Sequence, residues 1–160
     1  MIRFEHAGKA AAVAVIALLM AAPAAAQDRL RTVQTGQTAT PPAPEKKAHR
    51  VVMQVNVNDP ALMNLALNNA RNVQQDLGKQ NVEVEIVAYG PGLGMLKAES
   101  PVAGRLAAAL DANVTLLACE NTMQNTKVNR DDIYGGVRFV QAGVTHLMKR
   151  QKEGWAYIRP

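Results

Sequence analysis

The sequence predicts a doubly wound α/β fold, with a mostly parallel sheet of about five strands and helices on both faces. Short apolar segments alternate with amphipathic ones along residues 49–160, and turn residues separate them. That alternation is typical of parallel sheets built from βαβ units. The region is long enough to enclose one hydrophobic core without disulfide support, so we expect a single domain at 49–160.

The first strand and helix follow from their periodicity. A strand is predicted at 51–57, where valine and methionine alternate with polar residues. Asp59 and Pro60 then provide an N-cap and a first-turn proline for a helix that ends before Gly78. One face of this helix is apolar and should pack on the sheet.

The other elements are assigned in the same way. A polar segment without a helix is expected directly after the third strand. The predicted elements are a strand at 82–89, a glycine-rich turn at 90–94, a helix from the Ser100-Pro101 cap to about Asp111, a strand at 114–119, a helical turn at 130–134, a strand at 137–140, a helix at 144–153 and a strand at 155–158.

The first 26 residues have the order of a secretory signal peptide. Arg3 and Lys9 come first, an apolar stretch at 10–22 follows, and three alanines at 24–26 form a small-residue cleavage site. The stretch is shorter than the roughly 20 apolar residues that span a bilayer. We therefore expect cleavage near Ala26, a periplasmic or secreted protein, and no stable membrane insertion afterwards.

Residues 27–48 are rich in proline, threonine and glutamine and almost free of large apolar residues. Such a composition buries too little surface to fold, which predicts a disordered linker between the signal peptide and the domain.

Charge argues against nucleic acid as a partner. The net charge of the whole chain is +5, and the basic residues are scattered except for the run at 149–152, which is predicted to lie on a solvated helix face. Aromatic residues are few and do not alternate with the charges, so no stacking platform for single strands is expected.

Cys119 is the only cysteine, and it ends an apolar strand where the chain turns polar, so we expect its sulfur to lie at the surface. In an oxidising compartment an unpaired thiol needs an explanation. Because ligands bind beyond the carboxyl ends of parallel strands, we expect a small site there. Its candidate residues are Cys119 as the reactive thiol, with Asn58, Gly90, Gly92, Asn121 and Thr122 as ligand-binding neighbours.

Turn amides beside the sulfur would lower its pKa and favour the thiolate, whereas the Glu120 carboxylate would oppose this if it approached. The opposite interpretation is a buried, inert cysteine that acts as a small hydrophobic residue.

Cofactor and metal sites are not predicted. The turn at 90–94 lacks the third glycine of a dinucleotide fingerprint and the lysine of a phosphate-binding loop, so its glycines are interpreted mainly as structural. His146 is the one histidine well inside the domain, too few for a zinc set. A Cys119–Met123 copper site and a Cys119–His146 catalytic pair are weaker alternatives.

Four blocks of the sequence carry a resemblance to a known family: residues 64–72, the turn 89–93, the segment Ala118-Cys119-Glu120-Asn121-Thr122-Met123 and the ending 143–158. Together they resemble the DsrE/DsrF-like family. The resemblance implies a flavodoxin-like fold, assembly into small oligomers, and sulfur transfer in which a cysteine at the equivalent strand end carries a persulfide. Only Cys119 corresponds to that cysteine, with Asn121 and Thr122 in the same motif.

The resulting hypothesis is an exported sulfur-carrier or thiol-relay protein centred on Cys119. The family members that act in sulfur oxidation and transfer-RNA sulfur relay are cytoplasmic, so their partners are not carried over to this chain. The competing hypothesis is a noncatalytic oligomeric binding module with an incidental cysteine. A homo-oligomer is expected in both cases, partly because the last strand carries Trp155, Tyr157 and Ile158.

Overall fold

The computed structural model describes residues 47–160 and contains one five-stranded sheet in the order β4-β3-β2-β1-β5. All four strand pairings are parallel. The predicted doubly wound α/β class is therefore confirmed. The signal peptide at 1–26 and nearly all of the linker at 27–48 lie outside the described residues.

The strands are short and regular. The chain builds β1 to β4 outward in sequence order and then returns, so that β5 pairs with the other side of β1. Their bounds are β1 His49–Val55, β2 Val82–Ala88, β3 Val114–Cys119, β4 Arg138–Val140 and β5 Ala156–Ile158.

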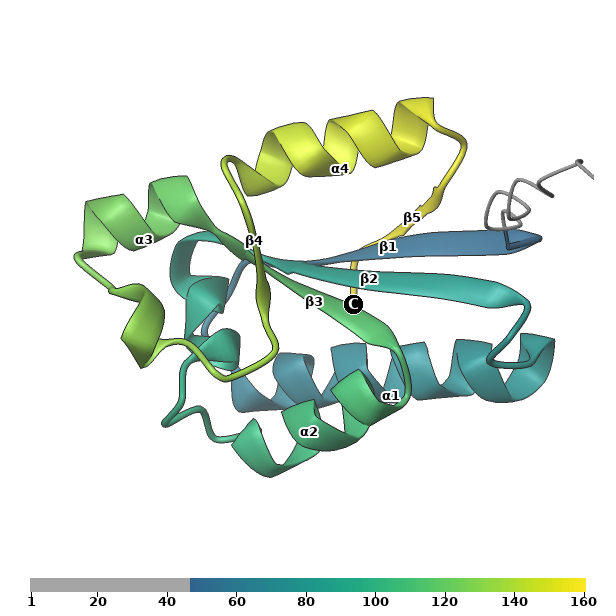
Figure 1. The fold of residues 1–160 in the computed structure, drawn as a ribbon, viewed down its shortest axis with the longest axis horizontal. Helices are drawn as coiled ribbons and strands as arrows, with labels where there is room; N and C mark the ends of the chain where they lie inside the picture. Colours follow the sequence, from purple (N-terminus) through teal and green to yellow (C-terminus); the bar gives the residue numbers. More distant parts are fainter. Residues whose placement is uncertain (1–46) are drawn as a thin grey trace, which may run out of the picture. The chain divides into compact units, whose positions relative to one another are not determined.

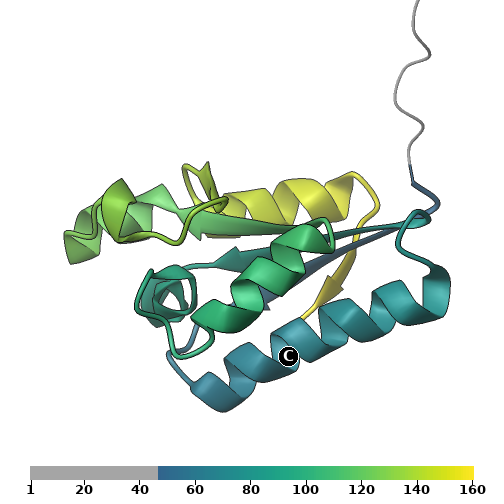
Figure 2. The same cartoon turned by 60° about the horizontal axis from the view of Figure 1, so that its bottom comes forward.

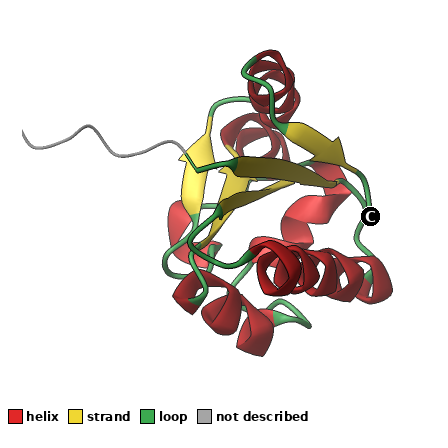
Figure 3. Cartoon of the chain, turned by 90° about the vertical axis from the view of Figure 1, so that its right-hand side faces the viewer, coloured by secondary structure: helices red, strands yellow, loops and turns green. Residues whose placement is uncertain are grey.

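Helices cover both faces of the sheet. In Figure 1, α1 and α2 lie side by side below the sheet and α4 lies above it; Figure 3 shows the strands between these two layers. Their neighbours η2 and α3 gather at the end of the sheet where β3 stops. The helices are α1 Pro60–Leu77, the 3-10 helix η2 Gly90–Leu96, α2 Ala103–Asp111, α3 Glu120–Thr126, the 3-10 turn η3 Arg130–Asp132 and α4 Gly143–Lys152.

The first strand differs from its predicted alternation. Val51 to Val55 are all buried, and Val57 lies beyond the strand end. Because helices cover both faces of this sheet, a central strand buries consecutive residues rather than every second one. The polar Gln54 is accommodated because its Oε1 accepts a hydrogen bond of 2.6 Å from the Tyr157 hydroxyl.

The predicted cap of α1 is confirmed, and that of α2 is shifted. The Asp59 side chain accepts a hydrogen bond of 2.8 Å from the Ala61 N–H, and Gly78 ends the helix at φ 85°. The Ser100 Oγ instead accepts from Val102 in a turn that precedes the helix, and α2 begins only at Ala103.

The polar segment expected after the third strand is in fact a helix. Glu120 to Thr126 form α3, which begins directly after Cys119 and ends at Lys127 in a left-handed conformation. Its only buried residue is Met123, so the segment lacks the apolar periodicity by which a helix is recognised in a sequence.

The core has two unequal parts. The larger cluster fills the space between the sheet and α1, η2 and α2, whereas the smaller one lies under α4. The smaller cluster consists of Val52, Val87, Leu117, Leu147 and Trp155. A single helix thus covers the sheet face on which Leu117 and, two residues later, Cys119 lie.

The helices of residues 47–160 were compared with the requirements for crossing a membrane. None of them combines the length and the apolar character that a crossing requires.

Gly92 allows η2 to pack against the end of β1. A Cβ atom at this position would lie 2.2 Å from the Val55 carbonyl oxygen and 2.8 Å from the Asn56 Cα. These are backbone atoms, which cannot move aside as a flexible side chain would. The contact places the Tyr89-Gly90 corner next to the end of the first strand.

We predict that Gly92→Ala lowers the free energy of unfolding by about 2–3 kcal/mol, because the methyl group overlaps this backbone. Gly104→Ala is the matched control, since a Cβ at Gly104 would meet nothing within 4 Å. The control should gain about 0.5–1 kcal/mol from helix propensity. Chemical denaturation of both variants tests this, and equal stabilities would contradict the packing role of Gly92.

Candidate functional site

Cys119 lies at the junction of β3 and α3, at the carboxyl edge of the sheet. It is the last residue of the strand and the N-cap position of the helix, with φ −79° and ψ 113°. Its relative exposure is only 5%, so the expectation that the thiol lies at the surface is wrong in the described structure. The first turn of α3 and the start of α4 close over the strand end, which a linear sequence does not reveal.

Polar groups from two different elements surround the sulfur. The Gly143 N–H, at the start of α4, donates a hydrogen bond of 3.3 Å to the Cys119 Sγ. The Thr122 hydroxyl and the N–H groups of Thr122 and Asn121 also lower the pKa of the Cys119 thiol. The thiol therefore faces hydrogen-bond donors from both α3 and α4.

Thr122 connects the glycine turn to this cluster. Its Oγ1 accepts a hydrogen bond of 2.9 Å from the Gly90 N–H, which leaves the hydroxyl proton available to the sulfur. Gly90 has φ 53°, a left-handed conformation that glycine adopts at little cost. The second and third strand ends are thereby joined at the site.

Asn121 holds the β4–α4 loop against α3. Its N–H donates to the Gln141 carbonyl oxygen at 3.1 Å, and the Gln141 Nε2 donates back to the Asn121 Oδ1 at 2.8 Å. Because Gly143 follows two residues later, this double contact keeps the Gly143 N–H beside the sulfur. The role of Asn121 here is to position the loop.

The electrostatics of the site favour the thiolate. Burial raises the pKa of the Cys119 thiol, but the hydrogen-bond donors of Thr122, Gly143 and Asn121 outweigh burial, and the net pKa lies below its ordinary value. Glu120 does not oppose this, because its carboxylate pairs with Arg130, whose guanidinium stacks 4.1 Å from the Phe139 ring centroid.

Sequence reasoning missed two residues of this cluster, Gly143 and Gln141, and it left Tyr89, at the end of the second strand, out of the candidate site residues. A Cβ at Gly143 would lie 3.1 Å from the Tyr89 Cβ, so the helix start and the tyrosine are in close contact. Burial, together with the nearby Tyr157 and Cys119, raises the pKa of the Tyr89 phenol, although Arg159 opposes this. The glycine at the start of a helix was the available signal for Gly143, and the end of the second strand marked Tyr89, whereas nothing local marks Gln141.

Two predicted ligand-binding residues are not part of the cluster. Gly92 packs against the backbone of β1, and the exposed Asn58 lies against η2, with its Oδ1 2.6 Å from the position of a Cβ at Gly94. The structure brings Gly90, Asn121 and Thr122 to Cys119, but it assigns Gly92 and Asn58 to local packing.

The structure does not support the roles considered for His146 and Arg150, which were a catalytic partner for Cys119 and a place on a solvated helix face. The buried Glu85 on β2 accepts from the His146 Nε2 at 2.7 Å and from the Arg150 Nη2 at 2.6 Å. The hydrogen bonds to Glu85 hold the pKa of Arg150 well above its usual range. His146 thus faces a carboxylate rather than the thiol, and Arg150 is not part of a solvated face.

Trp155 is also buried, at 5% exposure, so it adds no apolar surface of the kind expected for an oligomer contact. The Arg150 guanidinium stacks on its ring, 4.6 Å from the centroid.

The metal hypothesis finds no support in residues 47–160. That region contains no group of three or more His, Cys, Asp and Glu side chains arranged to hold an ion. Met123, the second donor of the suggested copper site, packs in the main core.

Comparison with known proteins identifies the family. The sequence matches the DsrE/DsrF-like family over residues 50–160, which is more than half of the chain. The chain belongs to the DsrE/DsrF-like family. The resemblance inferred from the sequence blocks is thereby confirmed.

Solved structures agree with this DsrE/DsrF-like assignment. MTH1491, a protein of unknown function from Methanobacterium thermoautotrophicum, is 38% identical, with a TM-score of 0.67 over 70% of this chain and 99% of its own. BT1422 from Bacteroides thetaiotaomicron, also of unknown function, is 16% identical, with a TM-score of 0.53 over 69% and 94% of the two chains. The second likeness concerns the fold alone. A search of curated proteins gave no significant match.

We predict that Thr122→Val raises the pKa of the Cys119 thiol, because valine has no hydroxyl proton to give to the sulfur. The rate of alkylation by iodoacetamide, followed against pH, should then reach its midpoint at a higher pH than in the wild type.

Thr122→Ser is the control, since it keeps the hydroxyl and should restore the wild-type midpoint. The wild-type midpoint should itself lie below that of the same thiol in denaturant. Identical profiles for all three folded proteins would show that Thr122 does not act on the sulfur.

Proposed function

We propose that this protein is a sulfur carrier in which Cys119 accepts sulfane sulfur as a persulfide and passes it on. The observation that carries the proposal is the set of hydrogen-bond donors that converges on a single thiol of lowered pKa. Membership of the DsrE/DsrF-like family supports a sulfur-relay role at the family level.

The transfer step is a thiol exchange that needs no external oxidant or reductant. The Cys119 thiolate attacks the outer sulfur of a persulfide donor, R–S–SH, and a new S–S bond forms as the donor bond breaks. The donor leaves as its thiol, taking one proton, and Cys119 is left as a persulfide. The reverse exchange delivers the sulfur to an acceptor thiolate.

The charge that moves in this step has defined partners at the site. Negative charge on the sulfur before attack is stabilised by the Gly143 N–H and the Thr122 hydroxyl. After transfer it moves to the outer sulfur, which must then lie one S–S bond further from these donors. The donors therefore stabilise the Cys119 thiolate more than its persulfide. The bound sulfur is then easily passed to an acceptor thiol, as expected for a carrier.

The low exposure of Cys119 requires the site to open. The sulfur lies behind the start of α4, which the Gln141–Asn121 contact holds in place. Moving this loop and the first residue of α4 off the sulfur breaks three hydrogen bonds, the two between Asn121 and Gln141 and the one from the Gly143 N–H to the Cys119 Sγ, each with a net value of about 1 kcal/mol. That cost is small enough for thermal opening to admit a donor on the timescale of turnover.

We predict that the wild type gains about 32 Da, one sulfur atom, on incubation with a polysulfide donor, and that Cys119→Ser does not. Intact-mass spectrometry measures the adduct, and dithiothreitol should remove it. Replacing a buried thiol by a hydroxyl should cost about 1–2 kcal/mol of stability, so a thermal unfolding curve must accompany the variant.

Cys119→Ala is a second variant that introduces no polar atom into the site, and it should also remain unloaded. The sulfur-carrier proposal fails if the folded wild type gains no adduct and its thiol reacts only in denaturant.

That outcome would favour the second candidate, a noncatalytic oligomeric binding module with a structural cysteine. The 5% exposure of Cys119 is the observation in its favour.

We further propose that the protein is exported, on the basis of its first 26 residues. Intact-mass analysis of a periplasmic fraction should give a chain that begins at Gln27. Recovery of the full-length chain in the cytoplasm alone would contradict this.

We also propose a homo-oligomer. Val144 and Met148, one turn apart on α4, are 52% and 53% exposed, and Tyr157 is 40% exposed. Light scattering should give a mass of at least two chains, and Met148→Glu should lower it if this face is the interface. Asn125→Glu, at an exposed position on α3, is the control. A monomer at all working concentrations would refute the proposal.

A further inference from the structure

A groove lies between α1 and α2, toward the edge of the sheet at which β3 begins. Cys119 lies at the opposite edge, where β3 ends. The free volume of the groove is about 430 Å³, a size typical of small-molecule sites. It is lined by Val114, the first residue of the strand that Cys119 ends. Figure 2 shows α1 and α2 running side by side on this face.

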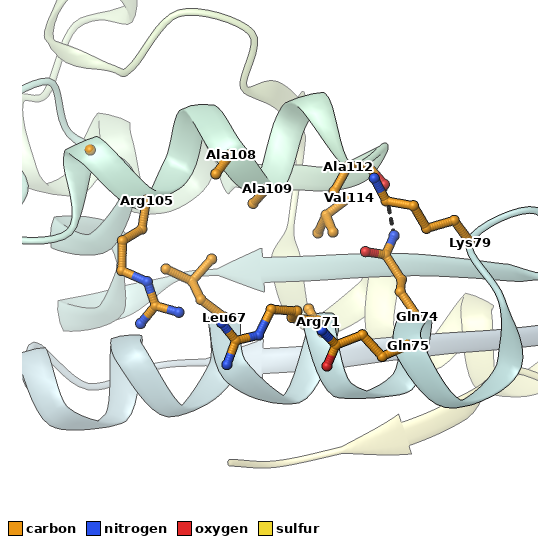
Figure 4. A pocket seen from close by; sticks show the side chains of 12 residues that line it. Leu67, Arg71, Gln74, Gln75, Lys79, Arg105, Ala108, Ala109, Ala112 and Val114 are labelled. Carbon is orange, nitrogen blue, oxygen red and sulfur yellow. Dashed lines mark hydrogen bonds between the residues drawn. The ribbon is translucent and has the colours of Figure 1, made fainter.

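The α2 side of the groove is apolar and formed by small residues. Ala108, Ala109 and Ala112 line one wall, and Leu67 of α1 lies on the other (Figure 4). Ala70 of α1 is also a lining residue. Alanine side chains leave room for a planar group between the two helices. Shape alone would not define a ligand.

The charged residues that line the groove are all positive. Arg71, Lys79 and Arg105 are among the lining residues, and these include no aspartate or glutamate. Arg105 stands near one end and Lys79 near the other (Figure 4). The Arg105 guanidinium is held in place by the Asn64 Oδ1 at 2.5 Å and the Asn68 Oδ1 at 2.8 Å. The groove is therefore complementary to an anion.

A buried amide adds a hydrogen-bond acceptor inside the groove. Gln74 is only 5% exposed, and its Nε2 donates to the Ala112 carbonyl oxygen at 2.7 Å. This bond turns the Oε1 toward the cavity (Figure 4). Within residues 47–160, the Trp155 Nε1 is the fully buried side-chain polar atom that has no hydrogen-bond partner. The Gln74 Oε1 is not in that state, so it is accessible from the cavity rather than sealed in the core.

We propose that this groove binds a small aromatic carboxylate whose ring carries an N–H or O–H donor. The ring lies on the alanine wall, the donor binds the Gln74 Oε1, and the carboxylate faces Arg71, three residues earlier on the same side of α1. A purely aliphatic anion fits less well, because it would cover the Gln74 oxygen without satisfying it. This binding site is independent of the sulfur-carrier proposal.

Indole-3-acetate is the probe, because it combines a carboxylate, a flat apolar ring and one N–H donor. Titration of the full chain by isothermal calorimetry should give one saturable site with a Kd between about 0.1 and 1 mM, as expected for about 13 non-hydrogen atoms at ordinary ligand efficiency. Tryptamine, with the same ring and a positive charge, should not bind. 1-Methylindole-3-acetate, without the donor, should bind about tenfold more weakly.

Two protein variants localise the site. Ala108→Leu fills the groove and should abolish binding, whereas Ala107→Leu, on the same helix but outside the lining, should leave it unchanged. Arg71→Gln should weaken binding about three- to tenfold. Circular dichroism confirms that each variant is folded.

The proposal is overturned if tryptamine and indole-3-acetate bind equally, or if Ala108→Leu and Ala107→Leu behave alike. It is also overturned if Ala108→Leu changes the mass measured by light scattering, because the groove would then be a contact between copies of this chain. Persulfide loading of Cys119 is measured separately, so failure of either proposal does not affect the other.

Discussion

The position of α4 is the constraint on which the site depends. Glu85 is a charged residue in the middle of a buried strand, and it requires partners where water is excluded. Arg150 and His146 supply them from α4, while Leu147 packs between them into the smaller core. Loss of Arg150 or His146 would leave the Glu85 carboxylate, which is itself almost fully buried, with fewer partners, so these contacts restrain the helix.

Because contacts restrain the middle and the end of α4, the position of its first residue, Gly143, is fixed as well. Gly143 lies against the Tyr89 side chain, where any Cβ would crowd the ring, and its N–H points at the Cys119 sulfur. The helix that covers the second face of the sheet thus also supplies a donor to the thiol. The same placement buries the thiol, so stabilisation of the thiolate and restriction of its access have one structural cause.

Strand order explains why these groups meet. The chain builds β1, β2 and β3 side by side, which brings the Tyr89-Gly90 corner next to the end of β3. It then crosses the opposite face through α4 to reach β5, beside β1. The groove between α1 and α2 lies toward the opposite edge of the sheet, where β3 begins. None of the residues that line it surrounds Cys119. The two ends of the domain are chemically distinct.

Much of the fold and part of the site could be predicted from local patterns. Apolar runs separated by turn residues identify the strands, Asp59, Pro60 and Gly78 mark the ends of α1, and a lone cysteine at a strand end marks the thiol. Each of these signals depends on neighbours within a few residues. The polar α3 was missed because its helix is held by the strand before it rather than by an apolar stripe of its own.

What the sequence by itself determined is the fold class, most element boundaries and the identity of the thiol with its neighbours Asn121 and Thr122. Only the tertiary structure decided that Cys119 is buried, that Gly143 and Gln141 belong to its surroundings, and that His146 faces Glu85 instead. Twenty or more residues separate the partners in these contacts. Such pairings arise from strand order and helix packing, and no spacing along the chain encodes them.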